Sequence, residues 1–192
     1  MTSARHRVVF VTGNKNKLEE VRQILDVESL NVDLVAQSID LPELQGESTQ
    51  SIAVEKCTTA AETLGCSVLT EDTSLCFEAL NGLPGPYIKW FLKSIGLDGL
   101  NKLLVGFEST NAYALCTFAY CKGPGHQPIV FEGRTDGNIV SPRGPTTFGW
   151  DPVFQPASFN QTYAEMEKSL KNTISHRYKA LMKVKDFFQT LQ

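Results

Sequence analysis

The first third of the chain alternates between a strand-like and a helix-like pattern of apolar residues. The β-branched and aromatic run 7–11 (Arg7-Val8-Val9-Phe10-Val11) predicts a buried strand. Apolar residues then recur at helical spacing, at Leu18, Val21 and Leu25, and Asn14 is suited to cap that helix. A second strand is predicted over 32–36, from Val32 to Ala36.

A second helix is predicted to begin at Ser48 or Thr49 and to end before Gly65, a residue suited to a helix C-terminus. Its apolar stripe consists of Ala53, Cys57, Ala60 and Leu64. A short strand from Val68 to Thr70 is predicted to end in Glu71-Asp72.

Strands are predicted to cluster later in the chain, after a short helix near Tyr87–Lys93. The predicted strands are 113–121, 129–132 and 138–140, with Asp136-Gly137 as a turn before the last of them. The Thr162-x-x-Glu165 capping box predicts the start of a last helical region, which ends in an amphipathic helix carrying Leu181, Val184, Phe188 and Leu191. Early alternation of strands and helices followed by clustered strands predicts an α/β fold with a mixed sheet.

Composition narrows the class of protein. The 192 residues are 42% hydrophobic and 20% charged, enough apolar material for one domain over residues 1–192, and no linker divides it. Lys and Arg number 18 against 21 Asp and Glu, a net charge of −3 that argues against a nucleic-acid-binding protein. No apolar run is long enough for a signal peptide or a membrane span. The five cysteines lack Cys-x-x-Cys spacing, so we expect buried, reduced thiols in a cytoplasmic protein.

The turn between the first strand and the first helix is the first candidate site. Lys15 and Lys17 lie in the first helical turn, where the positive end of the helix dipole disfavours cations. A strong anion such as a phosphate between them would explain that placement. The alternative is that both lysines simply point into water. The segment matches neither a P-loop nor a dinucleotide-binding motif.

Glu71 and Asp72 form the second candidate site, at the predicted carboxyl end of a buried strand, where α/β sheets bind ligands. Two carboxylates there predict a hard divalent cation, and Mg²⁺ is the natural choice beside phosphates. Glu43, in the loop after the second strand, could supply a further oxygen. The alternative is that Asp72 only caps the following turn.

Two further segments carry groups suited to a nucleotide. Residues 148–154 (Phe148-Gly149-Trp150-Asp151-Pro152-Val153-Phe154) hold three aromatic rings around an acid, which suits a flat heterocycle. Lys171 and the pair His176-Arg177 precede and open the terminal helix, and the two permanent cations could reach phosphates or carbonyl oxygens. The alternatives are a plain aromatic core and a solvated helix face. Taken together, the candidate sites form the set that a nucleoside triphosphate with a metal ion would need.

The same residues carry a family resemblance: the chain resembles the inosine triphosphate pyrophosphatases. The matching motifs span nearly the whole chain and are 11–20 (VTGNKNKLEE), 40–43 (DLPE), 71–73 (EDT), 82–91 (GLPGPYIKWF), 148–152 (FGWDP) and 175–177 (SHR). The chain departs from the family at Leu170, where a Glu usually precedes the Lys-Asn pair. The resemblance implies a two-lobed α/β fold with an active-site cleft between the lobes, a homodimer, and hydrolysis of ITP, dITP and XTP or dXTP to the monophosphate and pyrophosphate.

The resemblance also implies a role for each matching residue. Glu43 and Asp72 would hold Mg²⁺, with Mn²⁺ as a substitute. Asp72 is also the family's candidate catalytic base, and the sequence does not separate that role from orienting the water or binding the metal. Lys17, the other catalytic residue, would contact the triphosphate directly. The remaining substrate contacts would be Thr12, Gly13, Asn14, Lys15, Asn16, Lys56, Thr73, Lys89, Phe148, Gly149, Trp150, Asp151, Lys171, His176 and Arg177.

Two hypotheses about the chemistry follow. Water attacks the α-phosphorus, because the many cations suit a pyrophosphate leaving group. Donors from Arg177 and His176 recognise the 6-oxo group of the purine. Two other functions stay open at this point: a sensor that binds triphosphates without hydrolysing them, and a pyrophosphatase for other modified nucleotides.

Overall fold

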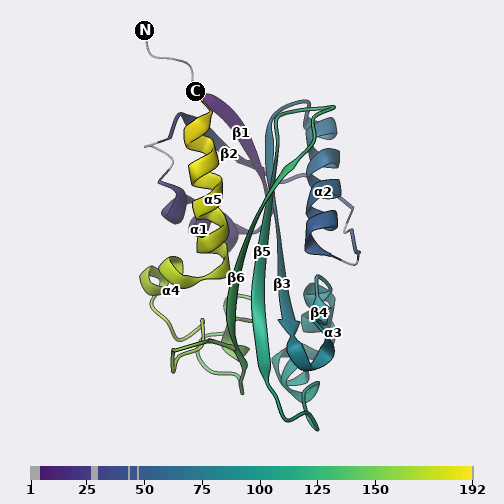
Figure 1. Cartoon of the computed structure of the whole chain (residues 1–192), viewed down its shortest axis with the longest axis vertical. Coiled ribbons are helices and arrows are strands. Elements are labelled where there is room, and N and C mark those ends of the chain that lie inside the picture. The colour runs from purple at the N-terminus through teal and green to yellow at the C-terminus, as the bar shows by residue number, and fades with distance from the viewer. Residues whose placement is uncertain (1–4, 27–29, 43, 47, 192) are drawn as a thin grey trace.

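The computed structural model describes residues 5–26, 30–42, 44–46 and 48–191. Its elements, in chain order (Figure 1), are β1 (His6–Val11), α1 (Lys15–Leu25), β2 (Val32–Gln37), α2 (Thr49–Leu64), β3 (Val68–Phe77), the 3₁₀ turn η2 (Glu78–Leu80), β4 (Pro84–Gly85), α3 (Ile88–Lys102), β5 (Asn111–Cys121), β6 (Ile129–Ile139), the 3₁₀ turn η3 (Asp151–Val153), β7 (Phe154–Pro156), α4 (Lys168–Ile174) and α5 (His176–Thr190).

One mixed sheet of seven strands forms the centre of the molecule. The strand order is β2-β1-β3-β5-β6-β7, and β4 pairs with β3 outside that path. β1 pairs in parallel with β2 and β3, whereas the pairings of β3 with β5, β5 with β6 and β6 with β7 are antiparallel. The predicted α/β fold with a mixed sheet is therefore confirmed.

Helices cover both faces of the upper part of the sheet (Figure 1). α1 and α5 pack on one face, where Phe10, Phe118 and Phe188 belong to one buried cluster. α2 packs on the other face through Ala53, Cys57 and Ala60, as its predicted stripe requires. Both helix starts have the predicted capping chemistry, because the side chains of Asn14 and Ser48 accept hydrogen bonds from backbone N–H groups of the first turn.

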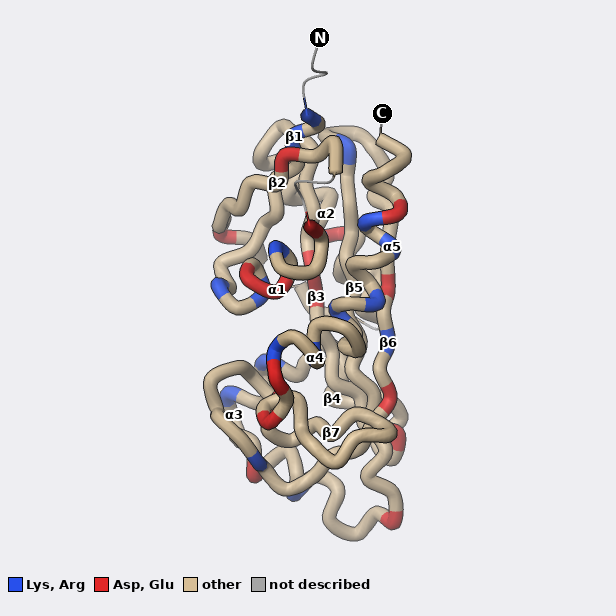
Figure 2. The backbone as a smooth tube through the Cα atoms, turned by 90° about the vertical axis from the view of Figure 1, so that its left-hand side faces the viewer, with Lys and Arg blue, Asp and Glu red and all other residues tan. Residues whose placement is uncertain are grey.

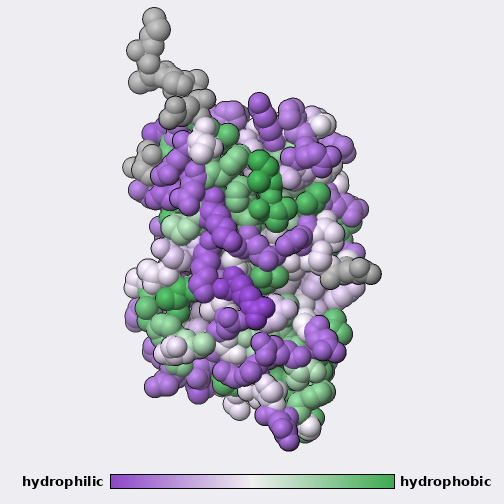
Figure 3. Space-filling view, in the orientation of Figure 1, coloured by the Kyte–Doolittle hydropathy of each residue, from purple (hydrophilic) through white to green (hydrophobic). Residues whose placement is uncertain are grey.

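The start of α5 lies directly on β6. A Cβ atom on Gly133 of β6 would come within 2.1 Å of the carbonyl oxygen of His176 and 2.4 Å of the backbone nitrogen of Ala180. Lys179 and Lys183 of α5 donate to backbone carbonyls of β6. Hydrophilic side chains cover the middle of this face of the molecule (Figure 3). The first turn of α5 is thus held against the sheet by close backbone contact at a glycine and by lysine side chains along its edge.

A second buried cluster lies in the lower part of the molecule and includes Phe77, Ile88, Trp150, Phe154 and Tyr163. Figure 2 shows this lobe, with α3, β4 and β7, beneath the lobe that holds β1, β2 and α1. The long strands β3, β5 and β6 extend through both lobes, so the sheet itself joins them (Figure 1). The predicted two-lobed architecture is confirmed.

The prediction that a short strand ends at Glu71-Asp72 was wrong. β3 continues to Phe77, and both carboxylates lie in its middle. Charged residues usually interrupt a buried strand, but Glu71 is 3% exposed here because cations from other elements neutralise it, as described below.

The prediction of a turn at Asp136-Gly137 was also wrong, since β6 runs unbroken through both residues. The Asp136 carboxylate accepts a hydrogen bond from Arg134, its neighbour along the same strand face, at 2.8 Å. Gly137 leaves room for β7, because a Cβ atom there would come within 2.4 Å of the Gln155 carbonyl oxygen. Both residues therefore serve strand pairing rather than chain reversal.

Two helix predictions needed adjustment. The helix predicted near Tyr87–Lys93 extends to Lys102 as α3, with a break at Gly96, whose φ is 67°. The capping box forms, since the Glu165 carboxylate accepts from the backbone N–H of Thr162 at 2.8 Å. It closes a turn, however, and the next helix begins only at Lys168.

Candidate active site

A cavity of about 800 Å³ opens between the two lobes. Most of the predicted site residues line it: Thr12, Gly13, Asn14, Lys15, Lys17, Lys56, Asp72, Thr73, Lys89, Phe148, Gly149, Trp150, Asp151, His176 and Arg177. Residues that the sequence analysis did not single out also line it, among them Ser38, Ile39 and Gln45 after β2 and Ile52 of α2. Their positions carry no chemical signal in the sequence, because they are ordinary loop and helix residues.

The N-terminal turn of α1 forms one wall of the cavity. The Asn14 side chain accepts from the backbone N–H groups of Asn16 and Lys17, at 3.0 and 3.2 Å. This cap orders the turn that carries Lys15 and Lys17 into the cavity. The Asn16 side chain donates instead to the Thr147 carbonyl oxygen at 3.5 Å, so it ties the two walls together and is not part of the lining.

Glu71 and Asp72 are separated by the geometry of their strand. Neighbouring residues of a strand point to opposite faces of the sheet, so each carboxylate meets different cations. Glu71 contacts Arg177 of α5 and Lys17 of α1, whereas Asp72 contacts Lys56 of α2. The expectation that the pair would serve one cation is therefore wrong for Glu71, whose oxygens are already occupied.

Glu71 is the centre of a buried ion-pair network. Two nitrogens of the Arg177 guanidinium donate to its two oxygens at 3.1 Å each, and the Lys17 ammonium lies 3.1 Å away. Thr73 donates a further hydrogen bond to it. Burial by itself would raise the pKa of Glu71, but the charges of Arg177 and Lys17 together hold this pKa well below its ordinary value. Glu71 is therefore an ionised anchor for two cations of the site.

This anchor makes the stability of the fold depend on pH. A carboxyl whose pKa is lowered by folding stabilises the folded state above its unfolded pKa, about 4.3 for Glu, and loses that contribution as the pH falls. We expect the free energy of unfolding to drop between about pH 5 and pH 3. The Glu71→Gln variant should be less stable than wild type at pH 7 and should depend less on pH in this window. Urea denaturation at several pH values measures both slopes, and equal slopes would contradict the assignment.

Asp72 keeps one oxygen free. Its Oδ1 accepts from the Lys56 ammonium at 3.0 Å, while its Oδ2 is buried without a hydrogen-bond partner among the described residues. Burial raises the pKa of Asp72, and the charges of Lys56 and Lys17 act against that rise. A buried carboxylate oxygen without a partner is costly unless a ligand satisfies it. The free oxygen of Asp72 is thus the acceptor that the site leaves open.

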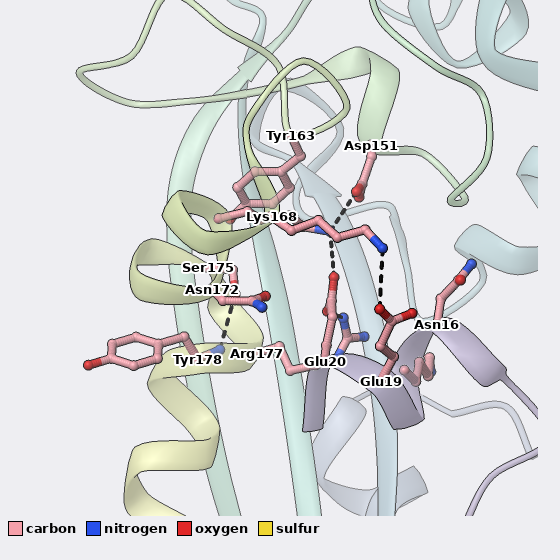
Figure 4. A network of polar contacts seen from close by, with 12 residues as sticks. Asn16, Glu19, Glu20, Asp151, Tyr163, Lys168, Asn172, Ser175, Arg177 and Tyr178 are labelled. Atoms are coloured by element: carbon pink, nitrogen blue, oxygen red, sulfur yellow. Dashed lines mark hydrogen bonds and ion pairs between the residues drawn. The ribbon is translucent and has the colours of Figure 1, made fainter. Parts of the chain in front are cut away.

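A second network holds Lys171, which is 4% exposed. Figure 4 shows two of its members, Asp151 and Glu20, on either side of this network. Its ammonium lies 2.6 Å from an Asp151 oxygen and 2.9 Å from a Glu20 oxygen. Glu20 also accepts from Arg177, so the two networks share this glutamate. Lys171 does not line the cavity, in contrast to the expectation that it contacts the nucleotide there. The sequence analysis did not identify Glu20 as a site residue. Its partners, Lys171 and Arg177, lie about 150 positions later in the chain, and nothing in the local sequence around Glu20 indicates them.

Aromatic rings form another part of the cavity wall. Trp150 and His176 lie 5.5 Å apart between ring centroids, inclined by 33°. The Lys171 ammonium lies 4.5 Å from the centroid of the half-buried Phe148 ring, and the Arg177 guanidinium 5.7 Å from it. Phe148, Trp150 and His176 all line the cavity, so the aromatic residues predicted from the sequence lie beside the cations Lys17 and Arg177. Arg177 itself has few donors left, because Glu71, Glu20 and Thr73 take most of them.

No group of three or more His, Cys, Asp or Glu side chains poised for a metal ion occurs within residues 5–26, 30–42, 44–46 and 48–191. Glu43, the second predicted metal ligand, lies outside the described residues. Lys89, predicted to contact the nucleotide, lines the cavity from α3 of the lower lobe.

The comparisons with known proteins agree with this picture. The family model described as the Ham1 family matches residues 8–187. The chain is 63% identical over 183 residues to an inosine triphosphate pyrophosphatase of Batrachochytrium dendrobatidis, covering 95% of this chain and 94% of that protein. It is 57% identical over 187 residues to one of Puccinia graminis f. sp. tritici, covering 95% and 96%.

Solved structures of similar fold cover the chain almost completely. A HAM1 protein from Coxiella burnetii superposes with a TM-score of 0.85 at 27% identity, over 95% of this chain and 98% of that one. The Ham1 protein of Staphylococcus aureus gives a TM-score of 0.82 at 26% identity, over 97% and 100%.

Proposed function

We propose that this chain, which belongs to the Ham1 family, hydrolyses ITP, dITP and XTP or dXTP to the nucleoside monophosphate and pyrophosphate. It is a hydrolase of the acid-anhydride bond in a nucleoside triphosphate. Such an activity removes nonstandard purines from the nucleotide pool. The relatives at 63% and 57% identity that bear the name inosine triphosphate pyrophosphatase support this substrate class.

The observation that carries the proposal is the composition of the cavity between the lobes. At one end, the N-terminal turn of α1 presents lysines and the positive end of a helix dipole, which suits a chain of phosphates. The cavity is also lined by Phe148, Trp150 and His176, whose rings are suited to stack on a flat base. Lys56 of α2 and Lys89 of α3 line the same cavity.

We propose that water attacks the α-phosphorus and that pyrophosphate leaves intact. Phosphoryl-type transfer depends chiefly on positioning and on neutralising charge, and the lysines of the cavity supply that charge. The free Oδ2 of Asp72 is an acceptor suited either to take a proton from the attacking water or, when it binds the metal ion, to orient that water. The ammonium of Lys17 lies 3.1 Å from a Glu71 oxygen, which holds it in the first turn of α1. There it would contact the phosphates.

A magnesium ion fits the donors that are present. Mg²⁺ prefers hard oxygen ligands and is usually bound through one or two carboxylates together with substrate phosphates. The free Asp72 oxygen supplies one such ligand, and the family resemblance assigns a second to Glu43. When bound, the ion, or Mn²⁺ in its place, would neutralise charge on the phosphates.

Three further statements belong to the proposal. The chain acts as one two-lobed domain, since β3, β5 and β6 run through both lobes. It forms a homodimer, as the family resemblance implies. It works in the cytoplasm, because its five cysteines are free and four of them are buried. Among the described residues, no helix is long and apolar enough to cross a membrane.

A pyrophosphate-release assay across ITP, XTP, GTP, ATP and CTP, with and without Mg²⁺, tests the proposal. We expect ITP and XTP to be hydrolysed with a metal ion present and the canonical nucleotides to be poor substrates. In ¹⁸O-labelled water the label should enter the monophosphate, because attack occurs at the α-phosphorus. Label in pyrophosphate would refute that step, binding without turnover would indicate a sensor, and a preference for CTP would indicate a pyrophosphatase for pyrimidine nucleotides.

A further inference from the structure

Residues 141–149 form an irregular segment that leads from β6 to η3. Residues 141–147 of this segment are exposed, whereas Phe148 and Gly149 at its end line the cavity. An exposed loop moves freely unless other parts of the chain hold it in place. The Phe148 ring can form a wall for a base only where the segment is fixed, so the contacts that hold the segment bear directly on the site.

Arg143 makes the contacts that hold this segment, although it is not among the described residues that line the cavity. Its backbone N–H donates to the carbonyl oxygen of Pro152 at 2.9 Å, and its own carbonyl oxygen accepts from the Thr162 hydroxyl at 3.0 Å. The Thr162 side chain is fully buried. The main chain at Arg143 is therefore bound on one side to η3 and on the other to the turn that precedes α4.

The guanidinium of Arg143 adds three hydrogen bonds to the same part of the chain. Its Nε donates to the Glu165 carboxylate at 3.1 Å, and its Nη2 donates to the Gln155 side chain at 2.7 Å and to the Asn160 carbonyl oxygen at 3.1 Å. An isolated exposed ion pair contributes little, but a planar guanidinium bound by three acceptors is held in one orientation. Backbone and side chain together fix the position of Arg143.

The capping box Thr162-x-x-Glu165, which does not begin a helix, supplies two of these partners. In a box that begins a helix, the Thr hydroxyl accepts from the backbone N–H three residues later. Here that hydroxyl donates to Arg143, and the N–H of Glu165 donates to the Thr162 carbonyl oxygen at 3.0 Å. One Glu165 oxygen accepts both from the N–H of Thr162 and from Arg143. The box therefore holds Arg143 in place of starting a helix.

The chain leaves Arg143 through a glycine that lies against the capping box. Gly144 has a φ of 85°, a conformation that residues with a side chain rarely adopt. A Cβ atom on Gly144 would lie 2.9 Å from the carbonyl carbon of Ala164 and 3.0 Å from the backbone nitrogen of Glu165. The direction in which the segment continues is therefore set where it crosses this turn.

The segment then reaches α1 and the cavity. The Thr147 carbonyl oxygen accepts from the Asn16 side chain of α1 at 3.5 Å. Phe148 follows, and the Lys171 ammonium lies 4.5 Å from the centroid of its ring. Residues 144–147 alone separate Arg143 from Phe148, so a displacement of Arg143 moves the ring.

We propose that Arg143, held by Thr162 and Glu165, is a positioning residue that fixes segment 144–149 and with it the Phe148 ring on which the purine base stacks. The inference rests on the proposed function and adds a residue outside the cavity on which binding of the base depends. Binding of the phosphates should not depend on Arg143, because the N-terminal turn of α1 is ordered by its own cap, Asn14.

The first test compares a ligand that has a base with one that has none. We expect Arg143→Ala to weaken the binding of ITP about tenfold, the range of a stacked base, and to leave the binding of inorganic triphosphate unchanged. Isothermal titration in metal-free buffer measures both affinities without hydrolysis. Arg134→Ala is the matched control, because its side chain is 48% exposed against 41% for Arg143 and also pairs with a carboxylate. An equal loss for both ligands in Arg143→Ala would overturn the proposal.

The second test determines whether Arg143 acts through Phe148. In a Phe148→Ala background, the change Arg143→Ala should cause no further loss of ITP affinity, because the ring that Arg143 positions is gone. A general loosening of the lobe would instead weaken ITP binding equally in both backgrounds, and that result would refute the assignment.

Thr162→Val provides a milder variant in case Arg143→Ala does not fold. It keeps the shape of the buried side chain and removes the hydrogen bond to the Arg143 carbonyl oxygen. We expect ITP affinity to fall about twofold to tenfold, with no change for inorganic triphosphate. Thr162→Ser, which retains the hydroxyl, should bind both ligands as the wild type does.

Wild-type affinity for ITP in a folded Arg143→Ala or Thr162→Val variant would refute the role of Arg143. Failure of the wild-type chain to release pyrophosphate from ITP would instead count against the proposed function. The two kinds of failure are separated, because the titrations do not depend on turnover.

Discussion

Replacement of Asp72 by asparagine is expected to lower kcat for ITP by about 10²–10⁴-fold while the chain stays folded. Asparagine has the shape of aspartate and retains an oxygen for the bond from Lys56, which measures 3.0 Å in the wild type. It loses the charge of the carboxylate, on which proton acceptance and metal binding both depend. Pyrophosphate release at saturating ITP and Mg²⁺ gives kcat, and circular dichroism reports the fold.

The pH profile provides a second measure of the same residue. As a general base, Asp72 should give the pH profile of wild-type kcat an acid limb, and this limb should vanish in Asp72→Asn. Asp136→Asn is the matched control, because the Asp136 side chain is 64% exposed and does not line the cavity. Wild-type turnover in Asp72→Asn would remove Asp72 from the mechanism.

The variant Arg177→Ala should lose about 3–5 kcal/mol of its free energy of unfolding. The change leaves Glu71 and Glu20 without the guanidinium that neutralises them, and the Glu71 side chain is only 1% exposed. A buried charge without a partner is far more costly than a missing contact. Urea denaturation at pH 7 measures the loss.

Lys168→Ala is the control for that experiment. Lys168 pairs with Glu19 at 3.4 Å, but the two side chains are 76% and 52% exposed. An exposed ion pair contributes at most about 1 kcal/mol, so this variant should be nearly as stable as the wild type. A loss of similar size in both variants would show that burial of the Arg177 network does not matter.

Local chemistry was enough to predict the elements that are stabilised by their own residues. Asn14 and Ser48 cap the helices that follow them, and Gly65 ends α2 with the positive φ of 65° that such an end requires. The spacing of apolar residues likewise identified the faces of α2 and α5. These features depend on neighbours along the chain, which a sequence displays directly.

Features that depend on distant partners could not be predicted. Glu71 was predicted to end a strand, because a carboxylate inside a buried strand is unfavourable when it has no cationic partner. In the folded chain Arg177 and Lys17, from two other elements, are its partners. Lys171 suggested a nucleotide contact, yet Glu20 and Asp151 already bind it from two other parts of the chain. The sequence shows which residues carry charge and does not show which charges neutralise one another.

Gly133 of β6 limits how the amino-acid sequence around this site can be altered. Any methyl group there would collide with the backbone of the first turn of α5 and would push it off the sheet. That turn carries the imidazole and guanidinium of the cavity, so a substitution in β6 would misplace both without touching a ligand. We expect protein engineers who seek altered base selectivity to find this position intolerant of every replacement, although it lies outside the pocket.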